Sequence, residues 1–145
     1  MIDIHTHILP NVDDGCKTLD EARECLLISK KNGVNSVILT PHFSIRDKKE
    51  TILNAYEEFK KQVADIDINI YLGAEMMYSR GFLKALREKK VITLNDSTVE
   101  LHFNEKAFDL VTDDNSRACK KFEKLLEKYH LVDDLIRYKC IEISY

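Results

Sequence analysis

Two histidines lie two residues apart near the start of the chain, and two aspartates follow shortly after them. Apolar and polar residues alternate over residues 2–5, a period of two that predicts a short strand. Because successive side chains of a strand point to opposite faces, His5 and His7 share one face and can approach one cation. Imidazole nitrogen suits zinc, iron, nickel and copper, and the carboxylates of Asp13 and Asp14 add harder oxygen ligands. A bare His-x-His pair is not specific, so ligands from other segments decide the interpretation.

Helices and strands alternate after this segment, and their periodicity predicts each of them. Thr18 and Glu21 form a capping box ahead of an amphipathic helix, and Gly33 stops that helix. Residues 36–40 form a nearly continuous apolar run that ends at Pro41, which is typical of a strand buried on both faces. The predicted helices are residues 19–32, 50–64, 81–89 and 116–129, and the predicted later strands are residues 36–40, 66–72, 98–103 and 138–143.

The other candidate ligands follow the ends of these strands. A right-handed crossover makes the strand at residues 36–40 parallel to the first, so His42 reaches the same end of the sheet as His7. Glu75 follows the next strand, and His102 lies near the carboxyl end of the strand after that. Loops at the carboxyl ends of parallel strands build the sites of sheets and barrels. The pattern predicts a mixed His and carboxylate metal site, compatible with two or more manganese, iron or zinc ions and with phosphate ester hydrolysis.

Length and composition indicate a single α/β domain over residues 1–145. The chain is 44% hydrophobic and 32% charged, which fits a soluble protein with a sizeable core. A net charge of −3 gives no electrostatic case for binding nucleic acid or an anionic membrane. No apolar run approaches the ~20 residues of a membrane span, and the acidic residue at position 3 is unlike a signal peptide. We therefore expect a cytoplasmic protein.

The cysteines are widely separated and include no Cys-x-x-Cys pair, which favours reduced thiols over a disulfide framework or a structural zinc site. Cys16 lies beside the histidine pair, but no sequence feature of a phosphate-cradling loop follows it. We therefore favour a thiol without a nucleophilic role. The four cysteines are Cys16, Cys25, Cys119 and Cys140.

Six segments carry a resemblance to a known family. They are Met-Ile-Asp-Ile-His-Thr-His-Ile-Leu-Pro10, Val-Asp-Asp-Gly15, Thr-Leu-Asp-Glu21, Ile-Leu-Thr-Pro-His42, Gly-Ala-Glu75 and Leu-Asn-Asp-Ser97. Together they closely resemble the amino-terminal half of the manganese-dependent bacterial tyrosine-protein phosphatases found with capsule and exopolysaccharide genes. These enzymes belong to the polymerase and histidinol phosphatase (PHP) superfamily. The resemblance covers about residues 1–103, and residues 104–145 diverge from it.

The resemblance implies a partial or distorted (β/α) barrel of PHP type, with mostly parallel strands, helices outside and a metal cluster at the carboxyl ends of the strands. By resemblance, His5 and His7 bind one metal ion and Glu75 bridges two. Asp14 and His42 belong to a third position. The implied metal is manganese, with iron or zinc as alternatives, and the full family site holds two or three ions.

The implied reaction is hydrolysis of protein phosphotyrosine by a metal-activated water, without a covalent cysteine intermediate. The implied substrate and partner is an autophosphorylating tyrosine kinase that governs polysaccharide export. Two later family segments, His-Pro-Glu-Arg and Ser-Asp-Ala-His, have no counterpart in this sequence. A metal-binding Glu of the family has its nearest matches here in His102 and Glu100. Arg46 and Arg80, in loops after strands, are weak candidates for binding phosphate.

Two alternatives remain open. The chain can be a truncated, catalytically weak or inactive PHP remnant that binds metal or the kinase partner. It can also be a small-molecule phosphoesterase, acting for example on histidinol phosphate with the same residues. The edge strands of an open barrel leave backbone groups unpaired, so we expect the carboxyl-terminal segment or a second subunit to cover them. A homodimer is one such arrangement.

Overall fold

A computed structural model describes residues 1–47, 49–79, 81–94, 98–102 and 140–144, together with Lys120 and Lys124. Helices and strands alternate along much of these ranges, as the periodicity predicts. In chain order, the elements are β1 (Ile2–Thr6), α1 (Leu19–Lys31), β2 (Ser36–Leu39), β3 (His42–Phe43), α2 (Lys49–Gln62), β4 (Asn69–Leu72), β5 (Glu75–Met77), α3 (Phe82–Arg87), β6 (Thr98–His102) and β7 (Cys140–Ser144).

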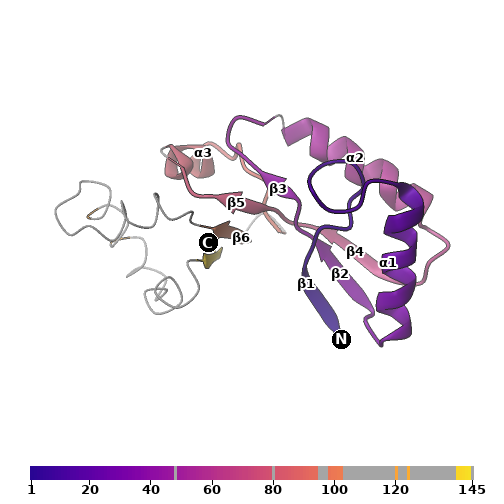
Figure 1. The fold of residues 1–145 in the computed structure, drawn as a ribbon. Helices are drawn as coiled ribbons and strands as arrows, with labels where there is room; N and C mark the ends of the chain where they lie inside the picture. The colour runs from indigo at the N-terminus through magenta and orange to yellow at the C-terminus, as the bar shows by residue number, and fades with distance from the viewer. Residues whose placement is uncertain are drawn as a thin grey trace.

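Parallel strands form two sheets (Figure 1). One sheet has the order β1-β2-β4, and the other has the order β3-β5-β6-β7, in which only β7 is antiparallel to its neighbour. Only Thr40 and Pro41 separate β2 from β3, and only Gly73 and Ala74 separate β4 from β5. Two stretches of chain therefore run through both sheets. The prediction of an α/β fold with parallel strands is confirmed, and the described residues do not close a barrel.

His42 and Glu75 begin new strands, whereas the sequence predicts them in loops beyond the ends of strands. Proline has no N–H to donate, so the ladder of β2 is interrupted at Pro41. The pairing then resumes, because the N–H of Glu75 donates to the carbonyl of Pro41 at 3.1 Å. His42 and Glu75 become register partners in the β3-β5 pair, which places them side by side.

The first helix begins and ends where its capping residues predict. The Thr18 side chain accepts a hydrogen bond from the Glu21 N–H at 3.2 Å, and the Glu21 carboxylate accepts one from the Thr18 N–H at 3.2 Å. This reciprocal pair satisfies two N–H groups that a helix start leaves without partners. Gly33 follows the helix with φ of +84°, a conformation that costs glycine little.

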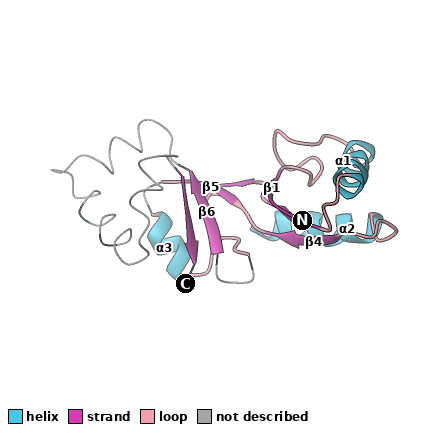
Figure 2. Ribbon diagram, turned by 90° about the horizontal axis from the view of Figure 1, so that it is seen from below, coloured by secondary structure: helices cyan, strands magenta, loops and turns pink. Residues whose placement is uncertain are grey.

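Helices α1 and α2 lie beside the sheet β1-β2-β4, while α3 lies with β5 and β6 (Figure 2), and the buried core includes residues of all three helices and both sheets. Leu26 on α1, Phe59 on α2, and Val37 and Leu39 on β2 are almost completely buried. Met76 on β5 is also fully buried. The apolar side chains at helical and strand spacing thus fix how the helices cover the sheet.

The remaining boundaries agree with the predicted elements to within two residues, except that the strand predicted from residue 66 begins only at Asn69. Of the helix predicted at residues 116–129, the structure describes Lys120 and Lys124, which are both helical, and the rest lies outside the described residues. No helix in the described ranges combines the length and apolarity that a membrane crossing requires.

Two adjacent leucines of α1 provide a matched test of this packing. Leu26 is 0% exposed and Leu27 is 52% exposed. We expect Leu26→Ala to lower the free energy of unfolding by about 2–5 kcal/mol, because truncation leaves a cavity. Leu27→Ala should change it by less than about 0.5 kcal/mol, since a surface substitution leaves no cavity. Urea unfolding followed by circular dichroism measures both values. Equal effects of the two substitutions would contradict this helix orientation.

Candidate metal centre

The two histidines of the first segment converge as their spacing predicts. His5 lies on β1 and His7 directly follows that strand. Their Nε2 atoms are 3.1 Å apart, and the two rings meet edge to face with centroids 5.0 Å apart. Both nitrogens therefore face one small volume at the carboxyl end of β1.

Glu75 supplies a carboxylate to the same volume from a different strand. Its Oε2 lies 3.0 Å from His7 Nε2 and 3.6 Å from His5 Nε2. The Glu75 side chain is only 9% exposed, so its charge is largely removed from water. His5, His7 and Glu75 each offer a ligand atom within 4.8 Å of the others, and together they form the first candidate ligand group.

His42 joins this group to a second one. His42 Nδ1 lies 3.3 Å from Glu75 Oε2, while its Nε2 lies 3.2 Å from Asp14 Oδ1. His7, Asp14 and His42 also offer ligand atoms within 4.8 Å of one another, and they form the second candidate ligand group. All five residues that the family resemblance implies as ligands thus come together, and the two groups share His7.

Asp13 plays a different part from Asp14 although the two are adjacent in sequence. Its Oδ2 accepts a hydrogen bond from His7 Nδ1 at 2.7 Å and another from the backbone N–H of His42 at 3.0 Å. Its Oδ1 accepts one from the N–H of Gly15 at 2.9 Å. Neither ligand group found among the described residues includes Asp13, although residue type and spacing alone offer both aspartates as ligands.

Burial and hydrogen bonding act in opposite directions on His7 and Asp13. Burial disfavours the imidazolium of His7, but its hydrogen bond to Asp13 and the charges of the surrounding carboxylates outweigh this effect and raise the pKa of His7. Burial likewise disfavours the carboxylate of Asp13, but the hydrogen bonds from His7 and from two backbone N–H groups lower the pKa of Asp13. The negative potential that favours a proton on His7 also favours a metal cation at this place.

The donor set fits a divalent transition metal. Neutral imidazole nitrogens and carboxylate oxygens together suit zinc, iron and manganese, and no thiolate belongs to either group. The donors come from three strands and one loop, so they are held by the backbone of the sheets rather than by one flexible segment. The two groups lie side by side, because both include His7.

The other candidates from the sequence are two arginines for phosphate binding and two residues of β6 for metal binding. Arg46 is exposed on the loop after β3, where its backbone N–H donates to the Ser44 hydroxyl at 3.2 Å. Arg80 lies outside the described residues. The backbone of His102 pairs with Met77 in β5, whereas Glu100 is the register partner of Glu75. Glu100 on β6 therefore occupies the position next to the candidate ligand Glu75, whereas His102 does not.

Cys16 and Cys25 lie closer together than their sequence spacing suggests. Both are free cysteines, and their sulfur atoms are 3.9 Å apart. Burial and the neighbouring Cys25 raise the pKa of the Cys16 thiol to about 11. Since the thiolate is the nucleophilic form, a protonated thiol supports the interpretation of Cys16 as a residue without a nucleophilic role.

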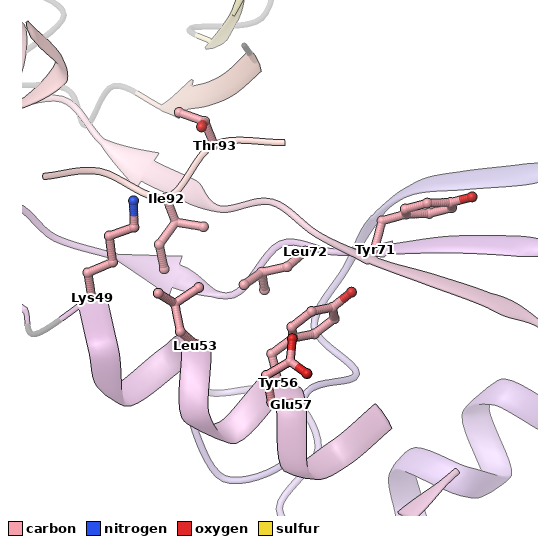
Figure 3. A pocket seen from close by; sticks show the side chains of 8 residues that line it. All are labelled: Lys49, Leu53, Tyr56, Glu57, Tyr71, Leu72, Ile92 and Thr93. Carbon is pink, nitrogen blue, oxygen red and sulfur yellow. The ribbon is translucent and has the colours of Figure 1, made fainter. Parts of the chain in front are cut away.

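A cavity of about 360 Å³ lies elsewhere, between α2, β4 and residues 92–93 (Figure 3). Figure 3 shows side chains of α2 forming one wall and those of the neighbouring segments forming the other. None of its lining residues belongs to either candidate ligand group. These residues are Lys49, Leu53, Tyr56, Glu57, Tyr71, Leu72, Ile92 and Thr93.

An α/β scaffold that gathers imidazoles and carboxylates at the carboxyl ends of parallel strands is typical of a metal-binding protein. The particular family follows from comparison with known sequences. The chain belongs to the family described as "Capsular polysaccharide synthesis, CpsB/CapC", whose family model matches residues 1–114.

Two curated relatives illustrate the similarity. The chain is 40% identical over 108 residues to the tyrosine-protein phosphatase CpsB of Streptococcus pneumoniae, a match that covers 70% of this chain and 44% of that protein. It is 28% identical over 102 residues to the tyrosine-protein phosphatase YwqE of Bacillus subtilis, covering 67% of this chain and 40% of that protein. The chain thus spans less than half the length of these relatives.

A solved structure has the same fold. It comes from the crystal structures of YwqE from Bacillus subtilis and CpsB from Streptococcus pneumoniae, described as unique metal-dependent tyrosine phosphatases. The TM-score is 0.65 at 24% sequence identity, and the match covers 92% of this chain and 63% of that chain. This likeness supports the α/β fold with parallel strands.

Gly15 offers a test of how tightly the loop between β1 and α1 is packed; this loop carries Asp13 and Asp14 and is called the ligand loop below. A Cβ at this position would collide with the carbonyl oxygen of His7 and lie 2.6 Å from the His7 Cβ. We expect Gly15→Ala to lower the free energy of unfolding by about 1–3 kcal/mol, because backbone must move to admit the methyl group.

Gly73→Ala is the matched control, since the nearest atom to its added Cβ is a side-chain carbon of Ile38 at 3.3 Å. Urea unfolding of both variants measures the difference. If Gly15→Ala were as stable as Gly73→Ala, the loop would not be held against His7 in this way.

Proposed function

We propose that this chain carries the metal-binding part of a phosphatase that hydrolyses protein phosphotyrosine and acts in the regulation of capsular polysaccharide synthesis. The observation that carries the proposal is the convergence of His5, His7 and His42 on the buried carboxylate of Glu75. Membership of the CpsB/CapC family and the names of the curated relatives supply the substrate class.

His5, His7 and Glu75 would hold one ion, and Asp14 and His42 would contribute to another beside it. A divalent metal supplies an activated water and stabilises the charge that develops on phosphate oxygens during ester hydrolysis. We favour manganese, with iron or zinc as alternatives that the same donors suit. The protein residues hold the ions in place, and the partly buried carboxylates keep negative charge at the site.

Glu100 is a further candidate for this centre. It pairs in register with Glu75, which itself pairs with His42, so the three residues form one row across β3, β5 and β6. Glu100 is level with Glu75, whereas His102 pairs with Met77 two positions further along, so this row supports Glu100 over His102 as the ligand from β6.

We propose an autophosphorylating tyrosine kinase of polysaccharide export as the substrate protein and partner. Phosphate binding needs cationic groups that reach the phosphate oxygens, and guanidinium groups do so with paired hydrogen bonds. Arg46 and Arg80 remain our candidates for this role, because each follows a strand that begins with a candidate ligand. The proposed fold is part of a distorted barrel, and a homodimer is one way to cover its open edge.

Activity tests this proposal directly. With added manganese, the protein should release phosphate from a phosphotyrosine peptide, and chelation with EDTA should abolish the release. Outer contacts of metal ligands are worth roughly 10–100-fold in activity, so Glu75→Gln, which alters a direct ligand, should lower kcat/KM by more than about 100-fold. Glu24→Gln, an exposed carboxylate on α1, is the charge-matched control and should keep full activity.

Three outcomes are distinguishable. Metal binding without phosphate release would overturn the catalytic proposal and favour the metal-binding remnant. A higher kcat/KM for histidinol phosphate than for the peptide would favour the small-molecule phosphoesterase. Equal activity of Glu75→Gln and Glu24→Gln would exclude this group of residues as the catalytic centre.

A further inference from the structure

We infer that Asp13 is a positioning residue of the proposed metal centre, which holds the His7 ring in its ligand orientation and ties the two ligand groups together. This inference rests on the proposed metal centre but not on the identity of the substrate. Asp13 belongs to neither ligand group found among the described residues, whereas the adjacent Asp14 belongs to the second group.

The Asp13 carboxylate accepts three hydrogen bonds. Its side chain is only 3% exposed, and a buried carboxylate is costly unless donors replace the lost water. Three N–H groups do so, from the His7 ring, the His42 backbone and the Gly15 backbone. These donors belong to three different points of the fold, so they fix both oxygens of the carboxylate.

One consequence concerns the proton on His7. An ionised carboxylate only accepts hydrogen bonds, so the His7 Nδ1 that faces Asp13 at 2.7 Å must carry the proton. The lone pair of the neutral ring is then on Nε2, the nitrogen that faces His5 and Glu75. A carboxylate in this relation to a ligand histidine sets its tautomer and makes it a better metal ligand.

A second consequence concerns the spacing of the two ligand groups. The Oδ2 atom that orients His7 also accepts the N–H of His42, which is 29 residues away in the sequence. His42 begins β3, so this bond fixes the ligand loop relative to the start of that strand. The N–H of Gly15 donates to the Oδ1 atom of the same carboxylate, so the residues before and after Asp14 are bonded to each other. One carboxylate thus sets the relative positions of His7, Asp14 and His42.

Metal affinity provides the first readout. Calorimetric titration of the metal-free protein with zinc should give an affinity about 10- to 100-fold lower for Asp13→Asn than for the natural sequence, with unchanged far-ultraviolet circular dichroism. The matched control is Asp47→Asn, because Asp47 also accepts a backbone N–H in a strand-end loop, from Ser44 at 2.6 Å. That variant should bind zinc with unchanged affinity. Equal affinities for the two variants would overturn the inference.

The tautomer of His7 provides a readout that a merely structural role would not move. Side-chain ¹⁵N spectra of the metal-free protein, recorded at a pH where the ring is neutral, distinguish the two tautomers, and His7→Gln assigns the signal. We expect a proton on Nδ1 in the natural sequence and a shift toward the Nε2–H form in Asp13→Asn. A proton on Nε2 in the natural sequence would overturn the inference even if Asp13→Asn failed to fold.

These readouts separate the inference from the proposed function. Weaker zinc binding and a changed tautomer in Asp13→Asn would support the role of Asp13 even if the protein released no phosphate from any substrate. The opposite result is also possible to recognise. If the protein hydrolysed phosphotyrosine and Asp13→Asn changed neither the zinc affinity nor the His7 tautomer, the function would be supported and the positioning role excluded.

Discussion

A carboxylate that is removed from water must be compensated by positive charge or by hydrogen-bond donors, and Glu75 is the residue on which this constraint falls. Its side chain is 9% exposed, and three imidazoles meet its Oε2 atom within 3.6 Å. His5 and His7 come from β1 and its carboxyl end, whereas His42 begins β3, so the sheets must hold these strands in place for the charge to be compensated. The site and the strand order therefore depend on each other.

Interrupted strands solve the geometric side of this constraint. A continuous strand would stay in one sheet, whereas the breaks at Thr40 and Pro41 and at Gly73 and Ala74 let the chain leave one sheet and enter the next. The pairing resumes with His42 opposite Glu75. Small residues and proline thus matter here because they end one ladder and leave the next ligand free to begin another.

Much of this arrangement could be predicted from the sequence. The period of two at residues 2–5, the capping box at Thr18 and the apolar run before Pro41 depend on local chemistry, and each is confirmed. The strands that begin at His42 and Glu75 could not be predicted, because two- and three-residue strands have no periodicity of their own. Residue type and spacing do not separate Asp13 from Asp14; the family resemblance implies Asp14 as the ligand, and the part of Asp13 follows only from its tertiary contacts. The contact between Cys16 and Cys25 depends on how the loop folds onto α1.

The hydrogen bond from the His42 backbone to Asp13 also gives the molecule an internal reporter. An amide hydrogen exchanges with solvent when the structure around it opens, and the exchange rate measures the free energy of that opening. The acceptor of this amide lies on the loop that carries Asp14, whereas the donor belongs to β3. Deuterium uptake at one backbone position in the second sheet therefore reports on the closure of a loop that begins directly after the first strand.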